Sequence, residues 1–232
     1  MSKASLQDRS GLIEAFLERA GWAGVDRSIL AADASFRSYD RLHGDNRKAV
    51  LMNAPPPQED IRSFLRIGKI LTRLGLSAPE IFASDTEAGL ILLEDFGDRT
   101  YTNLLREDPS REFELYSLAV DVLIDLHRRF EGAAHVPDYD DDRLLDEAGL
   151  LFDWYLPEVG SLGLDLSDAV RSDYIELWRK IMPLARQAPK TLVLRDYHVD
   201  NLMLLEDRGG VARCGLLDFQ DAVIGPSSYD LA

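Results

Sequence analysis

The sequence predicts an α+β fold in which a small β-rich region, residues 1–94, precedes a mainly helical region, residues 101–232. Short apolar runs bounded by turn residues indicate strands, and most of them fall in the first region. Apolar residues at helical spacing dominate the second region. The acidic, glycine-containing stretch between the two, residues 95–100, is therefore the expected hinge.

The first region carries the patterns of two helices and three strands. Gly21 and Gly75 follow the two helical stripes, as glycine often does at a helix end. The expected elements are a helix over residues 12–20, strands over 28–42, 48–52 and 89–93, and a helix that follows Pro55 to Pro57 and carries Glu59 and Asp60 in its first turn.

In the second region, amphipathic helices precede a short strand that leads to Asp196. Leu115, Leu118, Val122 and Leu126 share one face of the first of these helices. We expect helices from Arg111 onwards, over residues 144–156 and over residues 166–185, and a strand over 191–194.

Composition and hydropathy argue against nucleic-acid binding, an internal disulfide and a membrane span. The 232 residues include 26 basic and 41 acidic ones, a net charge of −15, which argues against binding a nucleic-acid backbone. The single cysteine, Cys214, allows no internal disulfide and fits a reducing compartment. No apolar run approaches the roughly 18 residues of a membrane span, and the N-terminus lacks a signal-peptide pattern. We expect a cytoplasmic protein, monomeric and not bound to a membrane.

Asp196, four further residues and Asn201 are followed by an apolar run that ends in Asp218 and Phe219. Kinase-type phosphotransferases use such a pattern to assemble a base and two magnesium ligands. Residues 202–205 and 211–217 flank Gly209 and Gly210, which predicts a hairpin with a two-residue turn. Paired residue numbers would then sum to 419 (209 + 210), and Asn201 would face Asp218 at about 5 Å. The alternative is that the three residues only cap turns and end strands.

Several segments resemble the aminoglycoside-phosphotransferase-like small-molecule kinases. The closing run over residues 215–222, followed by Gly225–Pro226 and residues 229–232, is similar to that family's "Asp-aromatic-x-Asp-Ala … Gly-x … Tyr-Asp-Leu-Ala" block. Within the family the chain is most similar to bacterial anomeric kinases of N-acetylmuramate and N-acetylglucosamine. The segments that support this are residues 34–39, 52–56, 93–98, 152–155 and 195–198.

The resemblance implies a protein-kinase-like bilobal fold, with ATP and Mg²⁺ as cofactors. Asp196 would orient the substrate hydroxyl or accept its proton, and Asn201 and Asp218 would hold magnesium. Arg195 would brace the loop or contact the substrate. The expected nucleotide contacts are Ser35, Phe36, Arg37 and Ser38 at the phosphates, and Glu94, Asp95 and Phe96 at the adenine.

The resemblance also implies phosphorylation of the anomeric hydroxyl of an amino sugar, to the sugar 1-phosphate, in peptidoglycan recycling. Asp221 would contact substrate or order its loop, Glu147 would bind sugar hydroxyls or face solvent, and Trp154 would stack on a sugar or pack in a helix core. Two other functions remain open: another small-molecule kinase, of the aminoglycoside or choline type, and a nucleotide-binding module without turnover.

The chain departs from the kinase pattern in two places. Protein kinases carry a lysine on the third strand that grips the phosphates, but here that strand has apolar residues at the expected position. Lys48 and Arg37 are the candidate substitutes. Family members also continue with further helices beyond the position of Ala232, so we expect the helical region to be incomplete.

Overall fold

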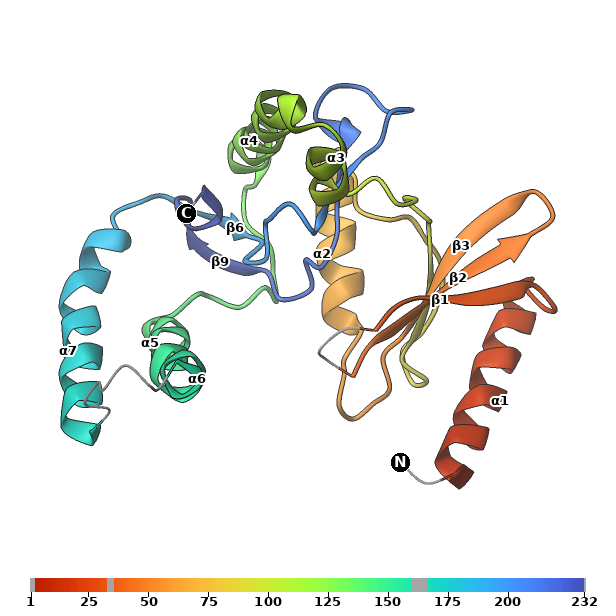
Figure 1. Cartoon of the computed structure of the whole chain (residues 1–232), viewed down its shortest axis with the longest axis horizontal. Coiled ribbons are helices and arrows are strands. Elements are labelled where there is room, and N and C mark those ends of the chain that lie inside the picture. Colours follow the sequence, from red (N-terminus) through yellow and green to blue (C-terminus); the bar gives the residue numbers. More distant parts are fainter. Residues whose placement is uncertain (1–2, 33–35, 160–166, 232) are drawn as a thin grey trace. The chain divides into compact units, whose positions relative to one another are not determined.

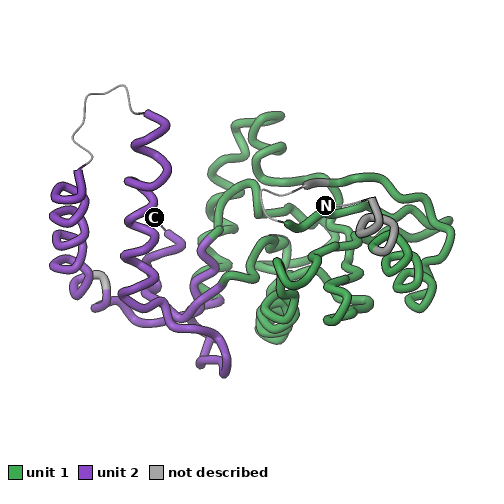
Figure 2. Tube along the Cα trace, turned by 90° about the horizontal axis from the view of Figure 1, so that it is seen from below, with its two compact units in different colours: residues 1–125, 196–221 green, residues 126–195, 222–232 purple. Residues whose placement is uncertain are grey.

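The computed structural model describes residues 3–32, 36–159 and 167–231. The chain forms two compact units, green and purple in Figure 2: unit 1 comprises residues 1–125 and 196–221, and unit 2 comprises residues 126–195 and 222–232. Helices and strands occur in both units, so the α+β prediction is confirmed. The expected division into residues 1–94, 95–100 and 101–232 stays a prediction. In the described ranges, no helix is long and apolar enough to cross a membrane.

Unit 1 contains a five-stranded antiparallel sheet with the order β1-β2-β3-β5-β4 (Figure 1). The expectation of one strand over residues 28–42 is wrong, because that stretch contains two strands that pair with each other. β4 was not indicated by the sequence patterns. The strands are β1 (Asp26–Ala32), β2 (Ser38–Gly44), β3 (Arg47–Asn53), β4 (Ile81–Asp85) and β5 (Leu90–Leu93).

The sheet packs against α1 (Lys3–Arg19), which begins earlier than the expected helix. Phe16 of this helix forms one buried cluster with Leu42 and Leu51 of the strands. Arg9 donates hydrogen bonds from Nε to Oδ1 of Asn53 (2.8 Å) and from a terminal nitrogen to the carbonyl oxygen of Ala88 (2.5 Å). These bonds fix the end of β3.

α2 (Arg62–Arg73) holds the aromatic residue that follows Asp218. Phe64 of this helix stacks on Phe219, with 4.8 Å between the ring centroids. The helix begins at Arg62, later than expected. Glu59 therefore lies in the segment before the helix and not in its first turn.

The expected hairpin is formed by β7 (Leu202–Leu204) and β8 (Cys214–Leu216), but its turn differs from the prediction. Gly209 and Gly210 do not make a two-residue turn, because residues 210–213 wind into a 3₁₀ helix. The N–H of Leu205 donates to the carbonyl of Arg213 at 2.8 Å and closes the longer loop.

The register of the hairpin is shifted by one residue as a result. Paired numbers sum to 418 (202 + 216), not 419. Asn201 therefore lies opposite Leu217, whose N–H donates to the Asn201 carbonyl at 3.0 Å, and Asp218 follows one residue later. The predicted direct pairing of Asn201 with Asp218 is wrong, although the two residues remain neighbours across the ladder.

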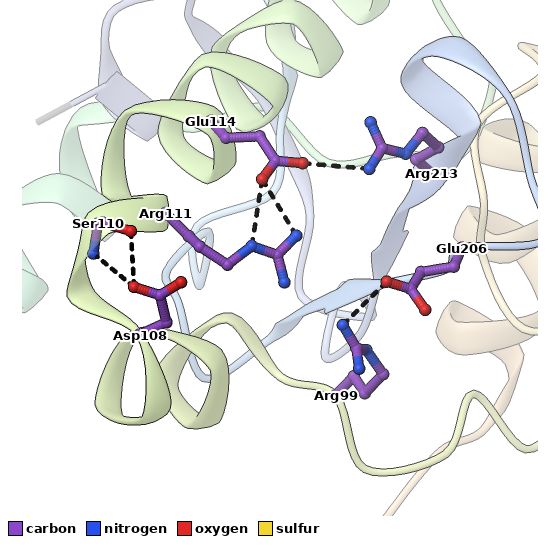
Figure 3. Close-up of polar contacts among 7 residues, drawn as sticks. All are labelled: Arg99, Asp108, Ser110, Arg111, Glu114, Glu206 and Arg213. Carbon is purple, nitrogen blue, oxygen red and sulfur yellow. Dashed lines mark hydrogen bonds and ion pairs between the residues drawn. The ribbon is translucent and has the colours of Figure 1, made fainter.

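Ion pairs connect the loop after β7 to the segments that precede and begin α4 (Figure 3). Glu206 pairs with Arg99 at 3.0 Å, and Arg213 pairs with Glu114 at 3.2 Å. These partners are well exposed, so the pairs orient the loop and add little stability. The helical elements of this part are α3 (Tyr101–Glu107), a 3₁₀ turn (Pro109–Arg111) and α4 (Glu112–Arg129), which ends in unit 2.

Unit 2 joins helices to a two-stranded antiparallel sheet of β6 and β9. Tyr139, Val193 and Val223 form its buried cluster. Asp140 caps α5 by accepting from the N–H of Arg143 at 3.0 Å. The elements are α5 (Asp141–Leu150), a π-helical turn (Leu151–Tyr155), α6 (Leu156–Glu158), α7 (Asp168–Ala185), β6 (Lys190–Val193) and β9 (Val223–Pro226).

Candidate nucleotide and metal site

Unit 1 has a cavity of about 440 Å³ with a mostly apolar lining that also includes Asn201 and Asp218. Val50, Leu93 and Met203 contribute apolar side chains to it. Cavities of ~300–1,000 Å³ with a few polar groups are typical of small-molecule sites. The two predicted metal ligands are therefore brought together, in one cavity.

The expected adenine-binding segment lies at the same cavity. Glu94 and Phe96 line it. The carboxylate of Asp95 instead pairs with Arg41 at 2.8 Å and accepts the N–H of Gly97 at 2.9 Å. The Asp95 side chain thus shapes this turn, and any contact of Asp95 with a nucleotide would have to come from its backbone.

A guanidinium that the sequence analysis did not identify supports this segment. Arg208, from the loop after β7, forms an ion pair with Glu94. Its guanidinium carbon also lies over the ring of Phe96, 5.1 Å from the centroid. A basic residue in a predicted turn is ordinary in sequence, so no local signal marked Arg208.

Hydrogen bonds within the loop from Asp196 to Asn201, and one to α4, fix its conformation. The side-chain amide of Asn201 donates to the carbonyl of Asp196 at 3.0 Å, and its backbone N–H donates to that of His198 at 2.9 Å. The hydroxyl of Tyr197 donates to the carbonyl of Ala119 at 2.7 Å. Because the amide nitrogen of Asn201 holds the loop, the amide oxygen is the atom suited to a metal. The side chain of Asp196 is exposed.

Asp218 has φ of +55°, a left-handed conformation that is uncommon for a residue other than glycine. Its Oδ1 accepts a hydrogen bond from Nε2 of Gln220 at 2.7 Å. The same oxygen lies 3.4 Å from a terminal nitrogen of Arg37. The buried ring of Phe219 anchors the chain directly after it. The packing of this segment thus holds the carboxylate of Asp218 at the cavity.

Of the expected phosphate-binding residues, Arg37 lies next to Asp218. The Nε of Arg37 is 4.0 Å from a carboxylate oxygen of Glu59, and the N–H of Phe36 donates to the other at 3.2 Å. The Ser38 hydroxyl accepts from the side-chain amide of Asn53 at 3.1 Å. Ser35 lies outside the described residues.

The donor set fits a magnesium nucleotide. Within the described residues, no three His, Cys, Asp or Glu side chains are grouped to hold a metal by themselves. A kinase-type site needs fewer protein ligands, because phosphate oxygens and water complete the shell. Asn201 and Asp218 supply two hard oxygen donors at one cavity. Beside them, the buried Oε1 of Gln220 has no hydrogen-bond partner among the described residues.

In unit 2, Arg195 and Glu147 form an ion pair of 2.5 Å. The hydroxyls of Tyr139 and Tyr229 also contact the Glu147 carboxylate. Burial raises the pKa of both tyrosines, so they stay protonated and donate. Asp230 accepts the backbone N–H of Arg195 at 2.9 Å, which holds that residue at φ of +71°. These contacts fix Arg195 itself within unit 2, and its bracing of the loop from Asp196 onwards stays a prediction.

The remaining candidates, Trp154 and Asp221, are exposed. Trp154 lies in the π-helical turn of unit 2 with 71% of its surface exposed, so the alternative that it packs in a helix core is wrong. Asp221 lies 3.4 Å from Nε2 of Gln220 and is otherwise open to solvent.

The pattern of the phosphotransferase enzyme family matches residues 26–232, which include Asp196, Asn201 and Asp218. The chain belongs to this family. Two curated relatives are N-acetylmuramate/N-acetylglucosamine kinases: that of Pseudomonas aeruginosa is 39% identical over 218 residues (91% of this chain, 60% of the relative), and that of Caulobacter vibrioides is 31% identical over 260 residues (97% and 70%). The chain thus spans 60% of the length of the Pseudomonas relative.

Solved structures confirm the protein-kinase-like fold expected for this chain. An aminoglycoside phosphotransferase in a ternary complex with streptomycin and ATP matches with a TM-score of 0.61 and 16% identity, over 99% of this chain and 74% of the other. The choline kinase of Streptococcus pneumoniae matches with a TM-score of 0.64 and 12% identity, over 95% and 73%. At such identities the likeness establishes the fold alone.

Proposed function

We propose that this phosphotransferase transfers a phosphoryl group from ATP to the anomeric hydroxyl of N-acetylmuramate or N-acetylglucosamine, in cytoplasmic peptidoglycan recycling. The observation that carries the proposal is the meeting of Asn201 and Asp218 at one largely apolar cavity of unit 1. The named activity of the curated relatives supports the choice of acceptor.

Each residue has a proposed part in the reaction. Asn201 and Asp218 would hold Mg²⁺, which supplies positive charge to the phosphates. Glu94 to Phe96 and the segment that contains Arg37 would hold the nucleotide. Asp196 would orient the sugar hydroxyl and accept its proton. An anomeric hydroxyl is more acidic than the other sugar hydroxyls, so its proton can leave late in the transfer.

Acceptor contacts are proposed for two exposed side chains. Asp221 follows the metal-binding segment and offers a carboxylate to a sugar hydroxyl. Trp154 offers an exposed indole face, on which sugars commonly stack. Glu147 and Arg195 already pair with each other, so we assign both to supporting the loop and not to the acceptor.

A coupled assay of ADP release, with ATP, Mg²⁺ and each amino sugar in turn, tests the proposal. Phosphorus and carbon NMR of the product would place the phosphate, and we expect it on C1. Phosphate on C6, or turnover only with choline or aminoglycosides, would favour a different small-molecule kinase. ATP binding without any turnover would favour a nucleotide-binding module.

A further inference from the structure

The guanidinium of Arg37 lies between two carboxylates. One terminal nitrogen is 3.4 Å from Oδ1 of Asp218, and Nε is 4.0 Å from Oε2 of Glu59. The Arg37 side chain is only 10% exposed, against 32% for Asp218 and 21% for Glu59. A charge this buried needs anionic partners. Glu59 is itself held in place by the N–H of Phe36.

The position from which kinases extend a lysine is apolar in this chain. Val50 and Met52 of β3 are both buried, and Val50 lines the cavity. Lys48 is exposed, pairs with His43 in the ladder and does not line the cavity. A positive charge at the cavity therefore has to come from a different element than β3.

We propose that Arg37 is the cation that replaces the strand lysine, that Glu59 orients it, and that Asp218 is its partner until a metal takes that carboxylate. This inference rests on the proposed function. A metal cation on the carboxylate of Asp218 would repel the guanidinium of Arg37 and weaken their contact. A guanidinium has five donors in a fixed fork, so Arg37 can keep Glu59 and turn its other donors to a phosphate.

Charge at this point supports the exchange. With Arg37 present, Glu59 and Asp218 leave one net negative charge, and without Arg37 they would leave two. Two carboxylates would repel a nucleotide whose metal has not yet bound. The 3.4 Å contact with Asp218 is also longer than a strong charge-assisted hydrogen bond, about 2.8 Å, as suits a partner that must be released.

The substitution Arg37→Ala tests the exchange through two binding measurements that should move in opposite directions. We expect the affinity for ATP in the presence of EDTA, measured by calorimetry, to fall about 10- to 100-fold, because a charge-assisted contact is lost. We expect the affinity for Mn²⁺ alone, followed by the EPR signal of the free ion, to rise about 2- to 5-fold, because Asp218 loses a competing partner.

Damage to the fold would lower both affinities, so it cannot mimic the expected result. A fall in the affinity of Arg37→Ala for Mn²⁺, or an unchanged affinity for ATP, overturns the inference. Glu59→Gln should lower the ATP affinity less than Arg37→Ala does, whereas the matched loss of a cation in Lys48→Ala should leave both affinities unchanged. Loss of ATP affinity in Lys48→Ala would assign the role to that lysine and overturn the proposal. If the unaltered chain fails to bind ATP at all, the proposed function fails as well. If the unaltered chain phosphorylates the sugar while Arg37→Ala binds ATP normally, the inference about Arg37 fails and the proposed function stands.

Discussion

Asp95 and Asp218 are each followed by a phenylalanine, and each contacts an arginine at or just before β2. Arg41 pairs with Asp95 at 2.8 Å, and the carboxyl side chain is only 4% exposed. Arg37 lies 3.4 Å from Asp218, whose side chain is 32% exposed and lines the cavity. The Asp-Phe motif therefore forms a buried ion pair at Asp95 and a partly exposed ion pair, at the cavity, at Asp218.

The phenylalanines show the reverse arrangement. Phe96, after the buried pair, lines the cavity, whereas Phe219, after the partly exposed pair, is buried against Phe64. In the first motif the carboxylate anchors the backbone and the ring lines the cavity. In the second the ring anchors the backbone and the carboxylate lines the cavity. Which member of the motif is buried decides which one is available for binding.

The largest effect is expected from Asp196→Asn, which should slow phosphoryl transfer without weakening the proposed metal binding at Asp218. Turnover should fall about 1,000-fold, because a positioned base acts mainly in the transition state. The affinity for ATP with Mg²⁺ should stay close to that of the unaltered chain. Steady-state kinetics and calorimetry on the same preparation measure both quantities. A parallel loss of affinity would mean that Asp196 belongs to the metal site.

Asp218→Asn should act on binding first. Loss of a direct ligand should weaken Mg²⁺-ATP at least about 100-fold, beyond the 10- to 100-fold typical of an outer partner. ATP in EDTA should bind no worse, because a negative charge has been removed beside the phosphates. Asp207→Asn, an exposed acid in the loop of the same hairpin, is the control. Equal losses with and without the metal would contradict the assignment of Asp218 as a ligand.

Asp95→Asn should act on stability instead. Removing one charge of a largely buried pair leaves Arg41 under-compensated, and we expect the free energy of unfolding in urea to fall by about 2 kcal/mol. Asp98→Asn is the matched control, because Asp98 also contacts Arg41 at 2.8 Å but is exposed. That change should cost under about 1 kcal/mol. If Asp95→Asn abolished Mg²⁺-ATP binding without loss of stability, Asp95 would belong to the binding site and would not be a residue that stabilises the fold.

The sequence predicted the fold class and the placement of Asn201 and Asp218 at one site, because both depend on local patterns and on motif order. The metal-binding role of the two residues stays a prediction. The sequence did not predict which residue of each Asp-Phe motif anchors the backbone and which one lines the cavity. This difference depends on Arg41 and Arg37, which reach Asp95 and Asp218 from distant parts of the chain. The hairpin register was missed by one residue because the loop winds into a 3₁₀ turn at Gly210 instead of turning at two glycines.

Glu59 was missed for a related reason. The acidic residues after the prolines suggested the first turn of a helix, but α2 begins at Arg62 and leaves Glu59 in the segment before the helix, next to Arg37. Proline and acidic residues mark a helix start only within a few residues. A shift of that size decides whether a carboxylate caps a helix or pairs with a cation.

The smallest effect is expected from Arg208→Ala, which tests whether the contact of Arg208 with Phe96 is needed to hold that ring at the cavity. Arg208 covers the ring and pairs with Glu94, and both charged partners are about a quarter exposed. A contact of this kind is worth about 0.5–1 kcal/mol. We therefore expect the affinity for ADP to fall about 2- to 5-fold by calorimetry. Arg213→Ala removes a cation from the same loop that pairs with Glu114 (Figure 3), and it should leave the affinity unchanged. If both substitutions weaken ADP equally, the effect comes from the loop as a whole, and Phe96 needs no partner of its own to hold its ring at the cavity.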